Sequence, residues 1–106
     1  MLSETAIREA AARVAAAAHA PLKVILFGSY ARGDADEGSD LDLLVVEREI
    51  PDYNEEYLRL HRTLDPLGVG VDLLLLTEGE LDQRRDWWTT PVYWAVREGK
   101  VLYERP

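Results

Sequence analysis

Residues 22–46 read LKVILFGSYARGDADEGSDLDLLVV, two apolar runs on either side of a polar segment rich in glycine and acidic residues. The runs at 22–27 and 41–47 consist largely of leucine, isoleucine and valine, a pattern typical of buried strands. Gly28 and Ser29 follow the first run directly. Because glycine followed by polar residues ends a strand, the segment predicts a strand, a turn into a short helix at 30–36, and a second strand.

The rest of the chain alternates between helical and strand patterns. Ser3, Asp52 and Thr77 each precede a segment of helical character, and these residue types favour helix N-caps. We expect helices at 3–20, 52–65, 77–87 and 90–98 and strands at 69–76 and 101–103, the last at a sheet edge. The helix at 52–65 carries a predicted core-facing stripe of Tyr53, Tyr57, Leu60 and Leu64. This order predicts one α/β domain over residues 1–106, a small mixed sheet with its helices mainly on one face and the other face free for a site.

The composition narrows the class of protein. The chain has 106 residues, no cysteine, 12 basic and 20 acidic residues, and a net charge of −8 at pH 7. The lack of cysteine excludes disulfide scaffolds and cysteine zinc sites, and the acidity argues against direct binding to nucleic acid. No apolar run approaches the roughly 20 residues of a membrane span, and the first residues lack the basic start of a secretory leader. We therefore expect a cytoplasmic protein without membrane contact.

Gly28 and Ser29 stand between a strand and the start of a helix, where backbone N–H groups can bind a phosphate. Glycine also lets the backbone come close to a ligand. Taken alone, the dipeptide favours an ordinary turn in which Ser29 caps the helix. Arg32 lies in the same loop and fits two roles equally well, a phosphate contact or a solvated loop residue.

Three aspartates form the second candidate feature. Asp40 and Asp42 lie two residues apart on a strand and therefore project to the same face, and Asp72 joins them if the strand at 69–76 pairs with the strand at 41–47. Grouped carboxylates repel one another unless a hard cation such as Mg²⁺ or Mn²⁺ lies between them. Three carboxylates around two such ions are what two-metal phosphoryl chemistry requires. The alternatives are a half-exposed acidic strand and a lone aspartate at a strand end.

Ten residues separate Ser29 from Asp40. This Gly-Ser, ten-residue gap, Asp-x-Asp pattern resembles that of the polymerase β-like nucleotidyltransferases, and most closely the minimal nucleotidyltransferase (MNT) family. The resemblance covers nearly the whole chain and implies the polymerase β-like nucleotidyltransferase fold. It further implies that Gly28 and Ser29 contact the triphosphate of ATP. By the same resemblance Asp40, Asp42 and Asp72 bind two Mg²⁺ ions, which Mn²⁺ can replace, and Asp72 helps to deprotonate the acceptor hydroxyl.

The resemblance also implies an acceptor and a partner. Minimal nucleotidyltransferases commonly pair with a small helical HEPN-family protein in toxin–antitoxin modules. In that setting the chain is an antitoxin that moves AMP from ATP to a tyrosine of its toxin. Two alternatives stay open: transfer to a small hydroxylated molecule, and a non-catalytic antitoxin that neutralises its partner by binding. The oligomeric state, a homo-oligomer included, is open as well.

The aromatic residues and histidines complete the candidates. Trp87, Trp88 and Trp94 fall within eight residues, and they either form a partner surface or cover the small core. His19 and His61 have no partner visible in the sequence, so we interpret both as structural.

Overall fold

The computed structural model describes the whole chain, residues 1–106, as five α-helices, one short 3₁₀ helix and four strands. In chain order these are α1 (Glu4–Ala17), β1 (Pro21–Phe27), α2 (Gly28–Arg32), β2 (Leu41–Glu47), α3 (Tyr53–Arg62), η1 (Asp65–Leu67), β3 (Val71–Thr77), α4 (Glu78–Arg84), α5 (Pro91–Glu98) and β4 (Lys100–Glu104). The predicted order of helices and strands is confirmed. None of the helices is both long and apolar enough to cross a membrane.

The four strands form one mixed sheet in the order β3-β2-β1-β4. β1 pairs antiparallel with β2 and β4, whereas β2 and β3 run parallel. Parallel neighbours need a crossover connection, and here α3 and η1 carry the chain from the end of β2 back to the start of β3. β4 lies at an edge of the sheet, which confirms the predicted C-terminal edge strand.

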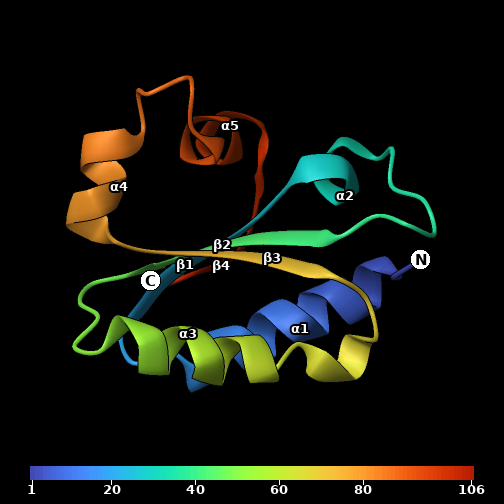
Figure 1. The fold of residues 1–106 in the computed structure, drawn as a ribbon, viewed down its shortest axis with the longest axis horizontal. Coiled ribbons are helices and arrows are strands. Elements are labelled where there is room, and N and C mark those ends of the chain that lie inside the picture. The colour runs from blue at the N-terminus through green and yellow to red at the C-terminus, as the bar shows by residue number, and fades with distance from the viewer.

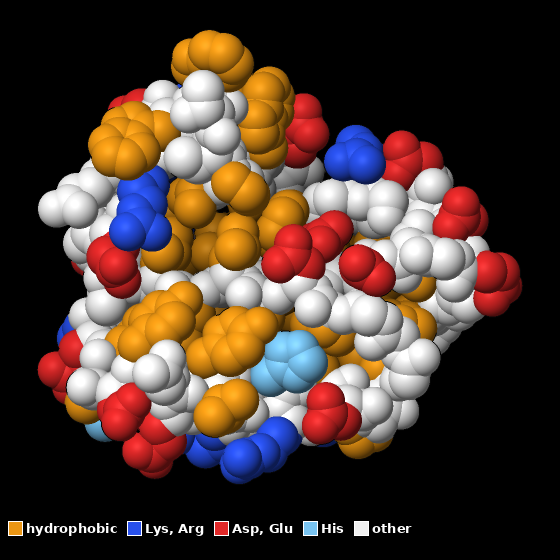
Figure 2. All heavy atoms as spheres, viewed as in Figure 1, with side chains coloured by type: hydrophobic (Ala, Val, Ile, Leu, Met, Phe, Trp, Pro, Cys, Tyr) orange, Lys and Arg blue, Asp and Glu red, His pale blue; other side chains and the backbone are white.

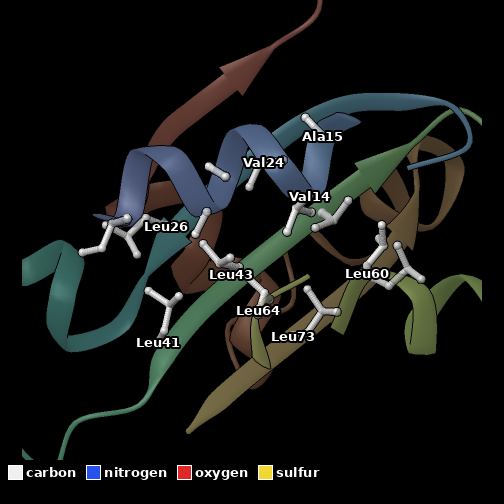
Figure 3. Close-up of a cluster of buried hydrophobic side chains, with 14 of the residues drawn as sticks. Val14, Ala15, Val24, Leu26, Leu41, Leu43, Leu60, Leu64 and Leu73 are labelled. Carbon is white, nitrogen blue, oxygen red and sulfur yellow. The ribbon is translucent and has the colours of Figure 1, made fainter. Parts of the chain in front are cut away.

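The long helices α1 and α3 cover one face of the sheet, as predicted, while α2, α4 and α5 lie over the other (Figure 1). Side chains alternate along the strands, so each face contributes its own set to the core. The larger cluster lies under α1 and α3 and includes Val14, Leu43, Leu60, Leu64 and Leu73 (Figure 3). The second face is not free: Leu44, Val46 and Leu76 pack there with Leu81 of α4 and Val92 of α5. The helices therefore leave only part of that face open for a site.

Predicted caps set most helix starts, but several boundaries differ from expectation. Ser3 and Asp52 each accept from a backbone N–H three residues on, at 3.1 Å, and Thr77 with Glu80 forms a complete capping box. α1 ends at Ala17 rather than residue 20, because Ala18 has an extended backbone. Tyr53 is 48% exposed, so only the second half of the stripe predicted on α3 is core.

Glu47 and Glu56 form a buried carboxyl pair at the end of β2 away from the aspartates. Glu47 accepts from the Ala20 N–H at 2.8 Å, and Glu56 accepts from the His19 N–H at 2.9 Å and pairs with Arg59. Burial and a hydrogen bond to Glu56 raise the pKa of Glu47 to about 7. The pKa of Glu56 is lowered although burial opposes this, because Glu47, the His19 N–H and Arg59 donate to its carboxylate. Of the two carboxyl groups, Glu47 is therefore the one whose protonated form is favoured in the folded protein.

Candidate active site

Asp42 and Asp72 lie side by side at the start of two parallel strands. In the register of β2 with β3, Asp42 is the partner of Asp72. Asp42 is two residues before Leu44, whose side chain packs under α4 and α5, so alternation places both aspartates on that face. The strand pairing on which the sequence prediction depended is therefore present.

The aspartates lie in an open hollow of about 410 Å³ between the sheet, α2 and α5. Figure 2, in which the sheet is seen edge-on as in Figure 1, shows acidic side chains gathered near the middle of the surface, beside an apolar depression. The sheet, α2 and α5 all contribute to the lining, which consists of Phe27, Gly28, Arg32, Asp42, Asp72, Pro91, Trp94 and Glu98. Four of the predicted site residues thus line one hollow: Gly28, Arg32, Asp42 and Asp72.

Two glycines make room for the carboxylates. Gly28 has a φ of +72°, and a Cβ there would collide with the Asp42 carboxylate, so any other residue would be strained on both counts. A Cβ on Gly70 would collide in the same way with the carboxylate of Asp40. Asp40 is exposed just before β2 and is held there by the hydrogen bond from the Leu41 N–H to the Gly70 carbonyl, at 2.8 Å. Sequence reasoning missed Gly70, although its place two residues before Asp72 was a signal.

The three aspartates repel one another in the absence of a counter-charge. Burial raises the pKa of Asp42 above its ordinary value, and the charges of Asp72 and Asp40 raise it further, against the opposing effect of Arg32. No three acidic or histidine side chains converge closely enough to enclose a single cation. Paired, partly desolvated carboxylates are nevertheless the donor set that hard divalent cations select, so the residues fit Mg²⁺ by their chemistry.

α2 does not start at the predicted residue, and the predicted Ser29 cap is absent. The helix begins at Gly28 itself rather than at residue 30, and Phe27 occupies the N-cap position without a side-chain hydrogen bond. Ser29 is inside the first turn, so the alternative in which it caps the helix is wrong. The first N–H groups of α2 therefore have no side-chain cap, and they follow directly after Phe27, the strand partner of Asp42. Arg32, in the last turn, lines the hollow and also pairs with exposed Asp34 at 3.4 Å, and its contact with a phosphate stays a prediction.

α5 contributes residues that sequence reasoning did not assign to the site. Pro91, Trp94 and Glu98 follow one another at helical spacing and line the hollow together. Trp87, Trp88 and Trp94 are 57%, 67% and 47% exposed, so none of them is a buried core residue. Only Trp94 reaches the aspartates' hollow, whereas Trp87 lines a neighbouring one with Tyr53.

The two histidines lie outside the hollow and contact carboxylates. The His19 ring lies 3.3 Å from Glu49, and the His61 ring lies 3.5 Å from Asp65 and beside Tyr57. These contacts agree with a structural role for both.

Comparison with known proteins identifies the family. A model described as the nucleotidyltransferase domain matches residues 7–91. The chain belongs to this nucleotidyltransferase family. A predicted protein adenylyltransferase of Methanocaldococcus jannaschii, MJ0604, is 36% identical over 81 residues, which cover 76% of this chain and 77% of the relative. A solved structure described as a predicted minimal nucleotidyltransferase is 35% identical, with a TM-score of 0.62 over 91% of this chain and 89% of its own. The resemblance to minimal nucleotidyltransferases is therefore confirmed.

Other nucleotidyltransferase relatives have a lower sequence identity or are matched over a smaller part of their length. The MNT antitoxin of Shewanella oneidensis, solved in complex with its tri-AMPylated HEPN toxin, is 21% identical, with a TM-score of 0.62 over 92% of this chain and 70% of its own. At that identity the likeness concerns the fold alone. Some curated relatives are matched over a small part of their length: the match to M. jannaschii MJ0141, 59% identical over 34 residues, covers 34% of that protein.

Proposed function

We propose that this nucleotidyltransferase moves AMP from ATP to a hydroxyl group, with Mg²⁺ as cofactor. The observation that carries the proposal is the register of β2 with β3, which aligns Asp42 with Asp72 in the same hollow as Gly28. A carboxylate pair beside an uncapped helix start offers ligands for cations and N–H donors for phosphate in one place. Membership in the nucleotidyltransferase family supports the same chemistry.

In this proposal Asp40, Asp42 and Asp72 would hold two Mg²⁺ ions, which would neutralise negative charge on the triphosphate and favour ionisation of the acceptor hydroxyl. Gly28 and Ser29 donate backbone N–H groups to the triphosphate, the Ser29 hydroxyl donates to it as well, and Arg32 adds positive charge in the wall of the hollow.

The reaction joins the acceptor oxygen to the α-phosphorus of ATP. The bond between that phosphorus and the β-phosphate oxygen breaks, and pyrophosphate leaves. Asp72 accepts the proton of the acceptor hydroxyl, which a carboxylate at the edge strand β3 can reach from the open side of the hollow. Catalysis then rests on positioning and electrostatics, as in phosphoryl transfer generally.

The proposed acceptor is a tyrosine of a HEPN-family helical partner, which makes the chain an antitoxin. Two observations support a protein acceptor. The S. oneidensis relative is solved with an AMPylated HEPN toxin, and this chain exposes Trp87 and Trp88 beside its hollow. Exposed tryptophans are characteristic of protein interfaces.

The test is mass spectrometry of a HEPN-family protein, taken from the gene next to this one where such a gene is found, after incubation with ATP, Mg²⁺ and the chain. We expect a mass gain of whole AMP units that maps to tyrosine. The Asp42→Asn variant should leave the partner unmodified, whereas the control Asp82→Asn, on the exposed face of α4, should behave as wild type. A partner that is bound and inhibited but unmodified would contradict transfer and favour neutralisation by binding.

A further inference from the structure

Trp94 is a half-exposed tryptophan in the wall of the catalytic hollow. Its side chain stands on α5, one helical turn after Pro91 and one before Glu98, and these three residues line the hollow with Asp42 and Gly28. Tryptophan is normally largely buried, yet Trp94 is 47% exposed at this position. A large flat apolar surface therefore borders a group of carboxylates.

The indole ring of Trp94 is held in place by contacts within the C-terminal segment. Its Nε1–H donates to the Trp88 carbonyl at 3.0 Å, and its ring meets the Tyr93 ring edge-on with centroids 4.9 Å apart. Arg97 lies 3.7 Å from the centroid of the Tyr93 ring and donates to the Arg85 carbonyl at 2.8 Å. The only polar group of the indole is thus satisfied, and the ring is oriented before any ligand arrives.

We propose that Trp94 is the stacking platform for the nucleobase of the bound nucleotide. This proposal rests on the proposed function, which places the triphosphate at Gly28 and Asp42. A nucleotide anchored there needs a surface for its flat aromatic base, and Trp94 is the aromatic side chain that shares the hollow with both of those residues and is half exposed. Stacking on an aromatic side chain is the common way to bind a base without reading its edges.

The position of α5 favours the nucleobase over an aromatic acceptor as the occupant. α5 packs against β1 and α2, the elements that present the proposed phosphate contacts, whereas α4 packs against the edge strand β3 that carries Asp72. Asp72, at the start of β3, lines the hollow of Trp94, whereas Trp87 lines the neighbouring hollow with Tyr53 and later residues of β3. Trp94 and Trp87 therefore belong to different parts of the surface.

The test compares two ligands that share phosphates but differ in the base. Dissociation constants are measured for a non-hydrolysable ATP analogue and for inorganic tripolyphosphate, both with Mg²⁺, on wild type, Trp94→Ala, Trp94→Phe and the control Trp87→Ala. Trp94→Ala should weaken the ATP analogue by roughly 5- to 150-fold and leave tripolyphosphate unchanged. Trp94→Phe should recover most of the loss, and Trp87→Ala should match wild type with both ligands.

The outcomes separate the platform from the function on which it rests. An equal loss of both ligands in Trp94→Ala would overturn the platform, because the hollow itself would have changed. Unchanged affinity for the ATP analogue together with a raised KM for the partner would also overturn it and assign Trp94 to the acceptor. If wild type binds neither ligand, the proposed phosphate and metal site fails, and the proposal for Trp94 fails with it.

Discussion

Replacing Glu47 with glutamine should make the protein more stable at neutral and basic pH and remove part of its pH dependence. Glu47 is fully buried, and its pKa rises from 4.5 to about 7 on folding. A folded-state pKa above the unfolded value means that the folded protein holds the proton more tightly. The stability from this proton is complete below pH 4.5 and is lost as the pH rises through about 7.

The size of the effect follows from the pKa rise. Each unit corresponds to about 1.4 kcal/mol, so ionisation of Glu47 removes up to about 3 kcal/mol of unfolding free energy between pH 4.5 and 8. Glutamine cannot ionise, but its amide oxygen can still accept from the Ala20 N–H and its NH₂ group can donate to Glu56. The contribution of Glu56 to the pH dependence of stability has the opposite sign. Its pKa is lowered on folding, so the stability that it provides is lost as the pH falls below 4.5.

The assay is urea unfolding of wild type, Glu47→Gln and the control Glu49→Gln at pH 5, 6, 7 and 8. Glu49 is a neighbouring exposed glutamate that contacts only the exposed ring of His19. The gain of Glu47→Gln over wild type should be near zero at pH 5 and grow to about 1–3 kcal/mol at pH 8, while Glu49→Gln follows wild type. A gain that is independent of pH, or a loss at pH 8, would refute the assignment of the raised pKa to Glu47.

Three further predictions concern the site. Asp42→Asn should abolish AMP transfer yet melt at the same temperature as wild type or higher, because it relieves repulsion with Asp72; a lower melting temperature with intact transfer would contradict this. Ser29→Ala should change the unfolding free energy by less than about 0.5 kcal/mol but weaken ATP binding about 10-fold or more. A loss of stability without a loss of ATP affinity would mean that Ser29 has a structural role. Trp87→Ala or Trp88→Ala should weaken partner binding more than about thirtyfold with unchanged melting curves. Leu58→Ala, at an exposed position on α3, is the control. Unchanged partner affinity in both tryptophan variants would place the docking surface elsewhere.

Local sequence patterns were sufficient to predict the core of the site. Strand periodicity places Asp42 on the face of Asp72, and the Gly-Ser pattern marks the end of β1, whereas Asp40 precedes β2 and does not line the hollow. The partnership of Asp42 with Asp72 required only that β2 and β3 be neighbours. Each of these features depends only on a few consecutive residues or on one strand pairing, so local sequence patterns are enough to indicate it.

What the sequence did not reveal depends on how distant elements pack. Trp94 enters the hollow because α5 crosses back over β1, and nothing within residues 90–98 indicates that crossing. Glu47 reads as the polar end of a strand, but the α1–β1 connection and α3 close over it and bury it. The spacing of Tyr53 predicts a core residue, yet Tyr53 is half exposed and lines an open hollow with Trp87.

The most direct test of AMP transfer uses ATP labelled at either the α- or the γ-phosphate, incubated with the chain, Mg²⁺ and the HEPN partner. Transfer of a nucleoside monophosphate should place the α-label, and none of the γ-label, on the partner, with pyrophosphate released and no labelling by Asp42→Asn. Labelling from the γ-phosphate, or none from either position while the partner is bound, would contradict the role assigned to Asp40, Asp42 and Asp72.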